Sequence, residues 1–339
     1  GDKLPAAQAK EWGMIWDVSD DCVGASLAMA AKLAAMPTQA LVATRALLRD
    51  ASTRTLSQQL DVERDTQSAM GKTHERKALM ERSSELFDCF YCYTNLLGNE
   101  SGRMIFDGEI LLTHQGKTLG RNQLLSFQDF QVLTFELDGT PQSIAEIQPK
   151  EWEFVQASSL GLMDYLRKSK SKGFVLSLSG GADSSTIAVL VAEMVRRGIS
   201  ELGLEKFTQK IGISSSSKSV VSESELVGKI LITAYQGTKN SSEDTLNSAK
   251  KLAESLGAVF YSWSIDEEVQ SYTQKIETAI GRKLTWEYDD LTLQNIQARS
   301  RSPIIWMLAN LTNSLLLSTS NRSEGDVGYA TMDGDTSGS

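Results

Sequence analysis

The chain has 339 residues, 41% hydrophobic and 23% charged, which is enough for two or three domains with packed cores. Its net charge of −9 argues against a nucleic-acid-binding surface, because such surfaces need clustered basic side chains. No apolar run is long enough to span a membrane and the first residues lack a secretory pattern, so we expect a cytoplasmic protein without a membrane partner.

The first 72 residues are predicted to be helical. An alanine-rich stretch at 25–34 forms the first clear helix, which ends before Pro37. Further helices are expected near 38–50 and 56–70.

Short apolar runs separated by turn residues follow from about residue 89. They predict strands at 90–93, 104–106, 110–112 and 132–135. The pair Cys89-x-x-Cys92 lies at the start of this segment, where a redox or zinc site is one interpretation. There is no second pair, and His74 and His114 lack ligand spacing, so we interpret both cysteines as buried strand residues.

From about residue 150 helices and strands alternate, which is typical of an α/β fold with a parallel sheet. Strands are predicted at 174–178, 230–235, 258–264 and 315–319. A helix is predicted over 243–256, stopped by Gly257. Residues 214–219 are serine-rich and predict a mobile loop, and Pro303 either begins or kinks a helix.

The most informative motif is Ser179-Gly180-Gly181-Ala182-Asp183-Ser184-Ser185, between the strand predicted at 174–178 and a helical run. Paired glycines let backbone N–H groups approach an anion, and the start of a helix adds a favourable dipole. The serine hydroxyls can donate to phosphate oxygens. Because a carboxylate repels phosphates unless a cation lies between them, the motif predicts a phosphate site with Mg²⁺ held partly by Asp183. The alternative is a plain strand-to-helix turn of small residues.

Three blocks in the second half of the chain resemble the NAD synthetases of the ATP pyrophosphatase (PP-loop) superfamily. They are this glycine turn, Asn295-Ile296-Gln297-Ala298-Arg299-Ser300-Arg301, and the stretch 318–335, in the family's order. The turn alone would also fit GMP synthetases, asparagine synthetases or tRNA-modifying enzymes, and the two later blocks narrow the choice. The resemblance implies a PP-loop (adenine nucleotide alpha hydrolase-like) α/β domain over 140–339, truncated before the family's closing segment.

Two further resemblances concern the first half. Residues 74–139 resemble the end of the nitrilase-like glutaminase domain of glutamine-dependent NAD synthetases, through 93–100 and 106–110. That domain's Glu, Lys and Cys nucleophile lie upstream of this stretch, and none is found at a matching position. Residues 6–72 are similar to the C-terminal helices of the enoyl-CoA hydratase/isomerase (crotonase) family, through 9–16, 36–38 and 60–65, and that family's acyl-CoA site also lies upstream. Three segments are therefore expected, at 1–73, 74–139 and 140–339.

The synthetase resemblance implies ATP-dependent amidation of deamido-NAD to NAD. The nicotinate carboxylate attacks the α-phosphorus of ATP, pyrophosphate leaves, and ammonia displaces AMP from the acyl-adenylate. No protein nucleophile is needed, because positioning and charge neutralisation supply the rate. Free ammonium would serve as the nitrogen source, since the glutamine route cannot run on this chain alone.

The resemblance also implies roles for single residues. The expected ATP contacts are Ser179, Gly180, Gly181, Ala182, Asp183, Ser184, Ser185 and Thr319. The expected Mg²⁺ ligands and catalytic groups are Asp183 and Glu324, and the expected deamido-NAD contacts are Asn295, Arg299 and Asp335. Alternatives stay open for Glu324 as a solvated loop acid and for Asn295 as a helix cap. Arg301 cannot share a helix face with Arg299, and it is either structural or a second phosphate contact.

Two other functions fit the same sequence. The chain could bind ATP without turnover, or the helices of 1–72 could serve as an oligomerisation module in a homo-oligomer. Acyl-CoA hydratase or isomerase activity is disfavoured, because the residues of the oxyanion hole are absent.

Overall fold

A computed structural model describes residues 5–15, 17–34, 45–49, 53–55, 58–59, 62, 75–99, 104–146, 148–213 and 222–320. The chain divides into two compact units, one of 1–92, 112–119 and 137–141 and the other of 93–111, 120–136 and 142–339. The segment boundaries predicted from the resemblances are a separate matter and stay predictions. The loop predicted at 214–219 lies outside the described residues.

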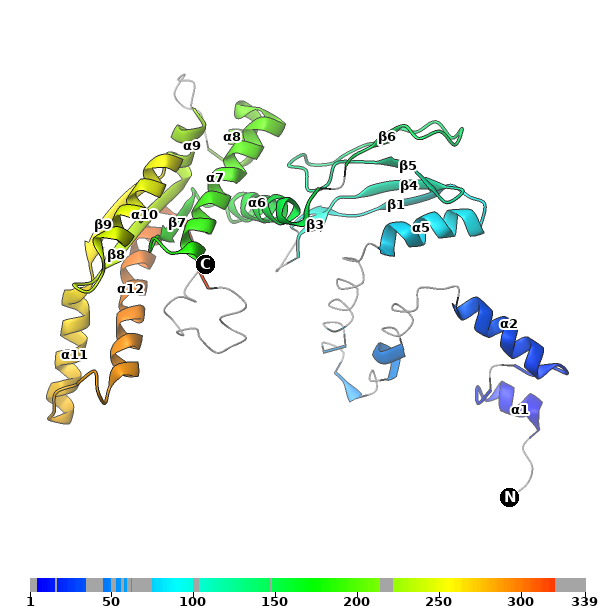
Figure 1. The fold of residues 1–339 in the computed structure, drawn as a ribbon, viewed down its shortest axis with the longest axis horizontal. Coiled ribbons are helices and arrows are strands. Elements are labelled where there is room, and N and C mark those ends of the chain that lie inside the picture. Colours follow the sequence, from blue (N-terminus) through cyan, green and yellow to red (C-terminus); the bar gives the residue numbers. More distant parts are fainter. Residues whose placement is uncertain are drawn as a thin grey trace. The chain divides into compact units, whose positions relative to one another are not determined.

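The second unit contains the predicted parallel sheet (Figure 1). Its strands are β7 (Phe174–Ser177), β8 (Leu231–Gly237), β9 (Val259–Ser264) and β10 (Leu315–Leu317). They pair in the order β10-β7-β8-β9, and every pairing is parallel. This confirms the predicted fold class and the four predicted strand positions.

Helices cover both faces of this sheet. They are α6 (Lys150–Ser169), α7 (Ala182–Leu202), α8 (Leu204–Lys210), α9 (Glu223–Ile230), α10 (Glu243–Leu256), α11 (Asp266–Ile280) and α12 (Asp290–Thr312). Because successive side chains of a strand point to opposite faces, Phe174 and Leu176 join the core beneath α7 and α10. Val175 joins a smaller core with Ile305 and Ala309 of α12 on the other face.

Local sequence signals set the limits of these helices. Ser242 caps α10 by accepting a hydrogen bond from the backbone N–H of Thr245, and Gly257 ends it with φ +79°. The helix predicted over 243–256 is therefore confirmed. Pro303 lies inside α12, at an exposed position, so it does not begin that helix.

The order of the strands creates a switch point. The chain runs from β7 through β8 to β9 toward one edge of the sheet, and then crosses to place β10 on the other side of β7. In open α/β sheets, ligands bind outside the carboxyl ends of strands where the winding direction changes. The carboxyl ends of β7 and β10 are therefore the expected place for a site.

The remaining strands form two small sheets. One has the order β1-β4-β5-β6, and the other pairs β2 with β3 antiparallel. Their bounds are β1 Tyr91–Thr94, β2 Leu97–Gly98, β3 Phe106–Asp107, β4 Ile110–His114, β5 Lys117–Arg121 and β6 Ser143–Ile144.

The prediction of a strand at 132–135 is wrong. These residues alternate between exposed and half-buried, which imitates a strand, but they have no regular structure. The ring of Phe135 instead fills the space that a side chain at Gly120 would occupy, so packing rather than strand pairing holds the segment.

Helices also occur in the first unit, at α1 (Ala6–Glu11), α2 (Cys22–Ala34) and α5 (Glu75–Leu86). The alanine-rich helix is thereby confirmed. Of the next two predicted helices the structure describes little, although 45–49 are helical. Among the described helices, none has the length and apolarity needed to cross a membrane.

Both cysteines of the Cys89-x-x-Cys92 pair depart from the buried interpretation. Cys92 is exposed on β1 and Cys89 is half-buried in the bend before it, and both are free thiols. Most side chains of the strand that carries Cys92 are exposed, so the residue type of a cysteine alone did not predict its burial correctly.

An ion pair closes the connection between α11 and α12. The guanidinium of Arg282 donates to both carboxylate oxygens of Asp289, at 2.8 and 2.7 Å, and the backbone N–H of Thr285 donates to the same carboxylate at 3.0 Å. The hydrogen bonds from Arg282 lower the pKa of Asp289 from its ordinary 3.8 to about 2.

This pair predicts a pH dependence. Because the folded-state pKa is the lower one, the stabilisation by Asp289 is fully present above about pH 4 and is lost as the pH falls from 3.8 toward 2. Urea midpoints of the wild type and of Asp289→Asn should differ at pH 6, and the difference should shrink steadily as the pH is lowered from about 4 to 2. A difference that stays constant over this range would contradict the assignment.

Candidate functional site

The glycine turn leads from the end of β7 into α7. Gly180 has φ +80°, a region that favours glycine, and a Cβ there would lie 2.5 Å from the carbonyl oxygen of Thr245. The backbone of the turn therefore lies directly against the first turn of α10. Gly181 is the N-cap of α7, so the first backbone N–H groups of that helix follow the turn immediately.

Hydroxyl groups close the turn on itself. Ser184 is buried, and its Oγ accepts from the backbone N–H of Ser179 at 3.2 Å and lies 3.1 Å from the Oγ of Ser179. The N–H of Gly181 donates to that Ser179 Oγ at 3.2 Å. Ser179, Gly181, Ala182 and Asp183 are exposed. The turn is therefore preorganised yet accessible to a ligand.

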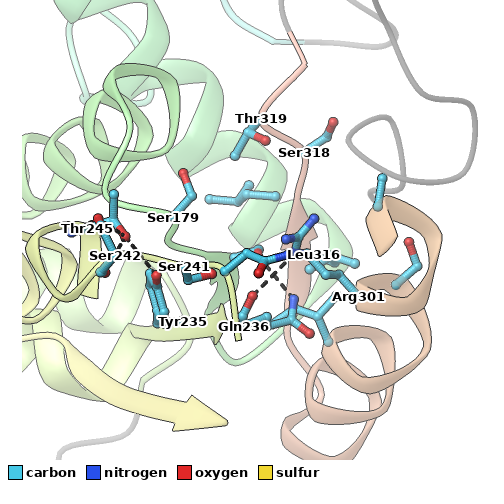
Figure 2. Close-up of a pocket in the computed structure, with 16 residues that line it drawn as sticks. Ser179, Tyr235, Gln236, Ser241, Ser242, Thr245, Arg301, Leu316, Ser318 and Thr319 are labelled. Carbon is cyan, nitrogen blue, oxygen red and sulfur yellow. Dashed lines mark hydrogen bonds between the residues drawn. The ribbon is translucent and has the colours of Figure 1, made fainter. Parts of the chain in front are cut away.

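A cavity of about 490 Å³ opens at the carboxyl ends of β7, β8 and β10 (Figure 2). It lies at the switch point of the sheet. The described residues that line it are Ser177, Ser179, Tyr235, Gln236, Asn240, Ser241, Ser242, Thr245, Ala298, Arg301, Ser302, Ile305, Leu316, Leu317, Ser318 and Thr319. Most of them carry hydroxyl or amide groups, so the cavity suits a polar ligand.

One wall of the cavity is a hydroxyl network on β8 and α10. The phenol of Tyr235 lies 2.8 Å from the Oγ1 of Thr245, and the Oγ of Ser242 donates to that same Oγ1 at 3.3 Å. Tyr235 is largely buried, so this network is fixed by packing. Since the carbonyl of Thr245 also contacts the glycine turn, the wall and the turn are held together.

A second part of the cavity lining is organised by Gln236, which is only 6% exposed. Its Nε2 donates to the Oγ of Ser177 at 3.1 Å, and its Oε1 accepts from the indole N–H of Trp263 at 3.3 Å. Its backbone carbonyl accepts from the Nε of Arg301 at 3.3 Å. Three strands and α12 thus meet at this residue, and Figure 2 shows Gln236 beside Arg301.

The residues predicted from the sequence are distributed unevenly around this cavity. Ser179 and Thr319 line it, whereas the predicted residues 180–185 follow Ser179 along the chain but are not among the lining residues. Asn295 and Arg299 lie on α12, half-buried and exposed respectively, and do not line it. Glu324 and Asp335 lie outside the described residues, so the predicted pairing of Asp183 with Glu324 stays a prediction.

Sequence reasoning missed the polar residues at the end of β8 and the start of α10. Tyr235 and Gln236 stand at the carboxyl end of a strand predicted to end at 235, two residues short. The signal was available, because ligand sites gather at the carboxyl ends of parallel strands. Ser242 carried a second signal as a helix cap, although its place on the cavity wall follows only from the fold.

A metal site is not complete within the described residues. No group of three or more His, Cys, Asp or Glu side chains that could hold an ion occurs among them. Asp183 presents an exposed carboxylate on the first turn of α7. One carboxylate is compatible with Mg²⁺, which keeps several waters and takes ligands from substrate phosphates.

Comparisons with known proteins agree with this geometry. A family model described as NAD synthase matches residues 154–339, which contain the sheet, the turn and the cavity. A glutamine-dependent NAD(+) synthetase from Arabidopsis thaliana is 26% identical over 324 residues, covering 77% of this chain and 43% of the relative. One from Synechocystis is 28% identical over 277 residues, covering 79% and 42%. The chain therefore spans less than half the length of these relatives.

Two solved structures are also similar. A glutamine-dependent NAD(+) synthetase from Cytophaga hutchinsonii is 54% identical, with a TM-score of 0.73 over 79% of this chain and 46% of that one. The synthetase from Acinetobacter baumannii, in complex with adenosine diphosphate, is 23% identical, with a TM-score of 0.63 over 79% of this chain and 44% of that one. The second likeness concerns the fold alone.

Proposed function

The chain belongs to the NAD synthase family, and from that premise we propose that it catalyses the ATP-dependent amidation of deamido-NAD to NAD. The observation that carries the proposal is the polar cavity at the switch point, which begins at Ser179 of the glycine turn and lies within the stretch matched by the family model. The Cytophaga relative, with 54% identity, bears the name of this activity.

The chemistry that we propose needs no nucleophile from the protein. A carboxylate oxygen of deamido-NAD attacks the α-phosphorus of ATP, and pyrophosphate departs. Ammonia then attacks the acyl carbon, loses a proton and displaces AMP. The task of the chain is to hold the two substrates in line and to exclude water, which is what a walled cavity with fixed hydroxyl groups provides.

We assign ATP to the turn and its surroundings. Ser179, Gly180, Gly181, Ala182, Asp183, Ser184, Ser185 and Thr319 are the proposed contacts. Ser179 and Thr319 already share the cavity, which supports the assignment. Ser184 is engaged within the turn, so its contribution is to hold the backbone N–H groups in place.

Mg²⁺ is the proposed metal, with Asp183 and Glu324 as its carboxylate ligands. When bound, the ion spreads the negative charge that develops on the α-phosphate. The exposed carboxylate of Asp183 beside the turn fits an ion that also takes phosphate oxygens.

We propose Asn295, Arg299 and Asp335 as contacts to deamido-NAD. Asn295 and Arg299 lie on α12, the helix that supplies one side of the cavity, but neither is among the lining residues, so this assignment rests on the family resemblance. We also propose that free ammonia is the nitrogen source. The chain is further proposed to be cytoplasmic and homo-oligomeric, and to consist of three segments, at 1–73, 74–139 and 140–339.

The direct test is pyrophosphate release from ATP in the presence of Mg²⁺, ammonium and deamido-NAD, with NAD measured in parallel. Release that requires all three additions supports the proposal. Binding of ATP without pyrophosphate release would instead identify a nucleotide-binding protein without turnover, and the absence of both would contradict the assignment.

The cysteines provide a negative prediction. Since Cys89 and Cys92 are not among the residues lining the cavity and the reaction uses no thiol, Cys89→Ser and Cys92→Ser should leave the rate of ammonia-dependent amidation unchanged. The rates of both variants are to be compared with the wild type under reducing conditions. A large loss would reveal a role for the thiols in the chemistry.

A further inference from the structure

Arg301 occupies a place in the cavity that its neighbour Arg299 does not. The α12 residues that line the cavity are Ala298, Arg301, Ser302 and Ile305, whose spacing puts them on one helix face. At 100° per residue, Arg299 lies about 200° from Arg301 around the helix axis, and it is exposed. Arg301 therefore faces the cavity, whereas Arg299 lies on another side of the helix.

The charge of the cavity depends on Arg301. Among the described residues that line it, Arg301 is the one with a charged side chain, and the others are hydroxyl, amide or apolar groups. Arg301 is also half-buried, so its charge is less screened than that of a surface arginine. A cavity with one cationic group among hydroxyl groups suits an anionic ligand.

Arg301 is held in position by other residues of the protein. Its Nε donates to the backbone carbonyl of Gln236, and the side chain of Gln236 is held in turn by Ser177 and Trp263. An arginine anchored through Nε is preorganised, so less conformational entropy is lost when its guanidinium binds a phosphate.

From this geometry we infer that Arg301 binds a phosphate group of ATP in the cavity. The inference rests on the proposed function and assigns one residue within it. ATP is favoured over the pyrophosphate of deamido-NAD, because Ser179 and Thr319 line the same cavity whereas Asn295 and Arg299 do not. Figure 2 shows Ser179, Ser318 and Thr319 along one side of the cavity and Gln236 on another.

The test compares ligand affinities of the purified full chain and three variants, Arg301→Met, Arg301→Lys and Arg196→Met. ATP with Mg²⁺ and deamido-NAD are titrated by calorimetry, and adenosine, which has no phosphate, by ligand-observed NMR. Arg196 is a matched control, since it is an exposed arginine on α7 that pairs with Glu193 and does not line the cavity.

Arg301→Met should weaken ATP binding about 10- to 100-fold, the loss of a charged hydrogen-bonding partner, and should leave adenosine binding unchanged. Arg301→Lys should recover part of the loss, because it restores a point charge without the planar guanidinium. Arg196→Met should bind ATP as the wild type does. If the methionine variant does not fold, the lysine variant alone must show the loss for ATP and none for adenosine.

Three results would overturn the inference. Unchanged ATP affinity in Arg301→Met, with ATP bound by the wild type, would remove the role of Arg301 and leave the proposed function standing. A loss for deamido-NAD but not for ATP would transfer the arginine to the other substrate. A wild type that binds neither ligand would remove the proposed function and this inference with it.

Discussion

Asp183→Ala is expected to abolish the Mg²⁺-dependent part of ATP binding while the fold stays intact. The carboxylate is exposed on the first turn of α7, directly after the glycine turn, and we propose that it binds the ion that neutralises the phosphates. Affinity for ATP with Mg²⁺ should fall by roughly two orders of magnitude, about 2.7 kcal/mol. Stability should change by less than about 1 kcal/mol, the usual contribution of an exposed acid at a helix N-terminus.

Calorimetric titrations with ATP, in Mg²⁺ and in a chelator, measure this effect. Glu223→Ala is the matched control, because Glu223 is also an exposed acid in the first turn of a helix, α9, but that helix does not follow the glycine turn. The control should keep its full response to Mg²⁺. Metal-dependent binding that survives in Asp183→Ala would count against Asp183 as a ligand.

Gly180→Ala is expected to damage both the fold and the site. The new Cβ would lie 2.5 Å from the carbonyl oxygen of Thr245, and alanine would also have to adopt φ +80°. We expect a loss of roughly 1–3 kcal/mol in the free energy of unfolding from backbone strain. ATP binding should fall as well, since the displaced first turn of α10 carries Ser242 and Thr245 of the cavity wall.

Gly203→Ala separates these two effects. Gly203 follows α7 with φ +79°, but a Cβ there would meet no atom within 4 Å. It shares the unfavourable backbone conformation without the collision, so it should lose stability in urea unfolding and keep its affinity for ATP. Equal ATP affinities in Gly180→Ala and Gly203→Ala would show that the close approach of the turn to α10 is not needed.

Much of the parallel sheet was predictable because its strands are short apolar runs bounded by turns. The helix at 243–256 was predicted within its limits, since a serine cap and a terminal glycine mark its ends. The prediction of a strand at 132–135 failed, because alternation of apolar and polar side chains does not reveal whether a partner strand exists. The prediction that Cys92 is buried failed for a related reason, because the burial of a strand residue depends on which elements cover the strand.

The candidate site was predictable where one continuous motif carries it. The seven residues of the turn at 179–185 are enough to predict a phosphate site. The turn is exposed and is held by its own hydrogen bonds, which agrees with that prediction. The cavity wall was not predictable in the same way, because Gln236 and Arg301 are 65 positions apart and meet only through the order of the strands. Spacing told Arg299 from Arg301, but it could not say which of them faces the cavity.

The crossover that places β10 beside β7 has a consequence for biogenesis. Ser179 and Thr319 are 140 positions apart, and they become neighbours only when the last strand of the sheet docks. Contacts between such distant parts of a chain form slowly, since a large loop must close first. On the ribosome the glycine turn is made long before the strand that completes its surroundings, so competence to bind nucleotide should arise late in synthesis.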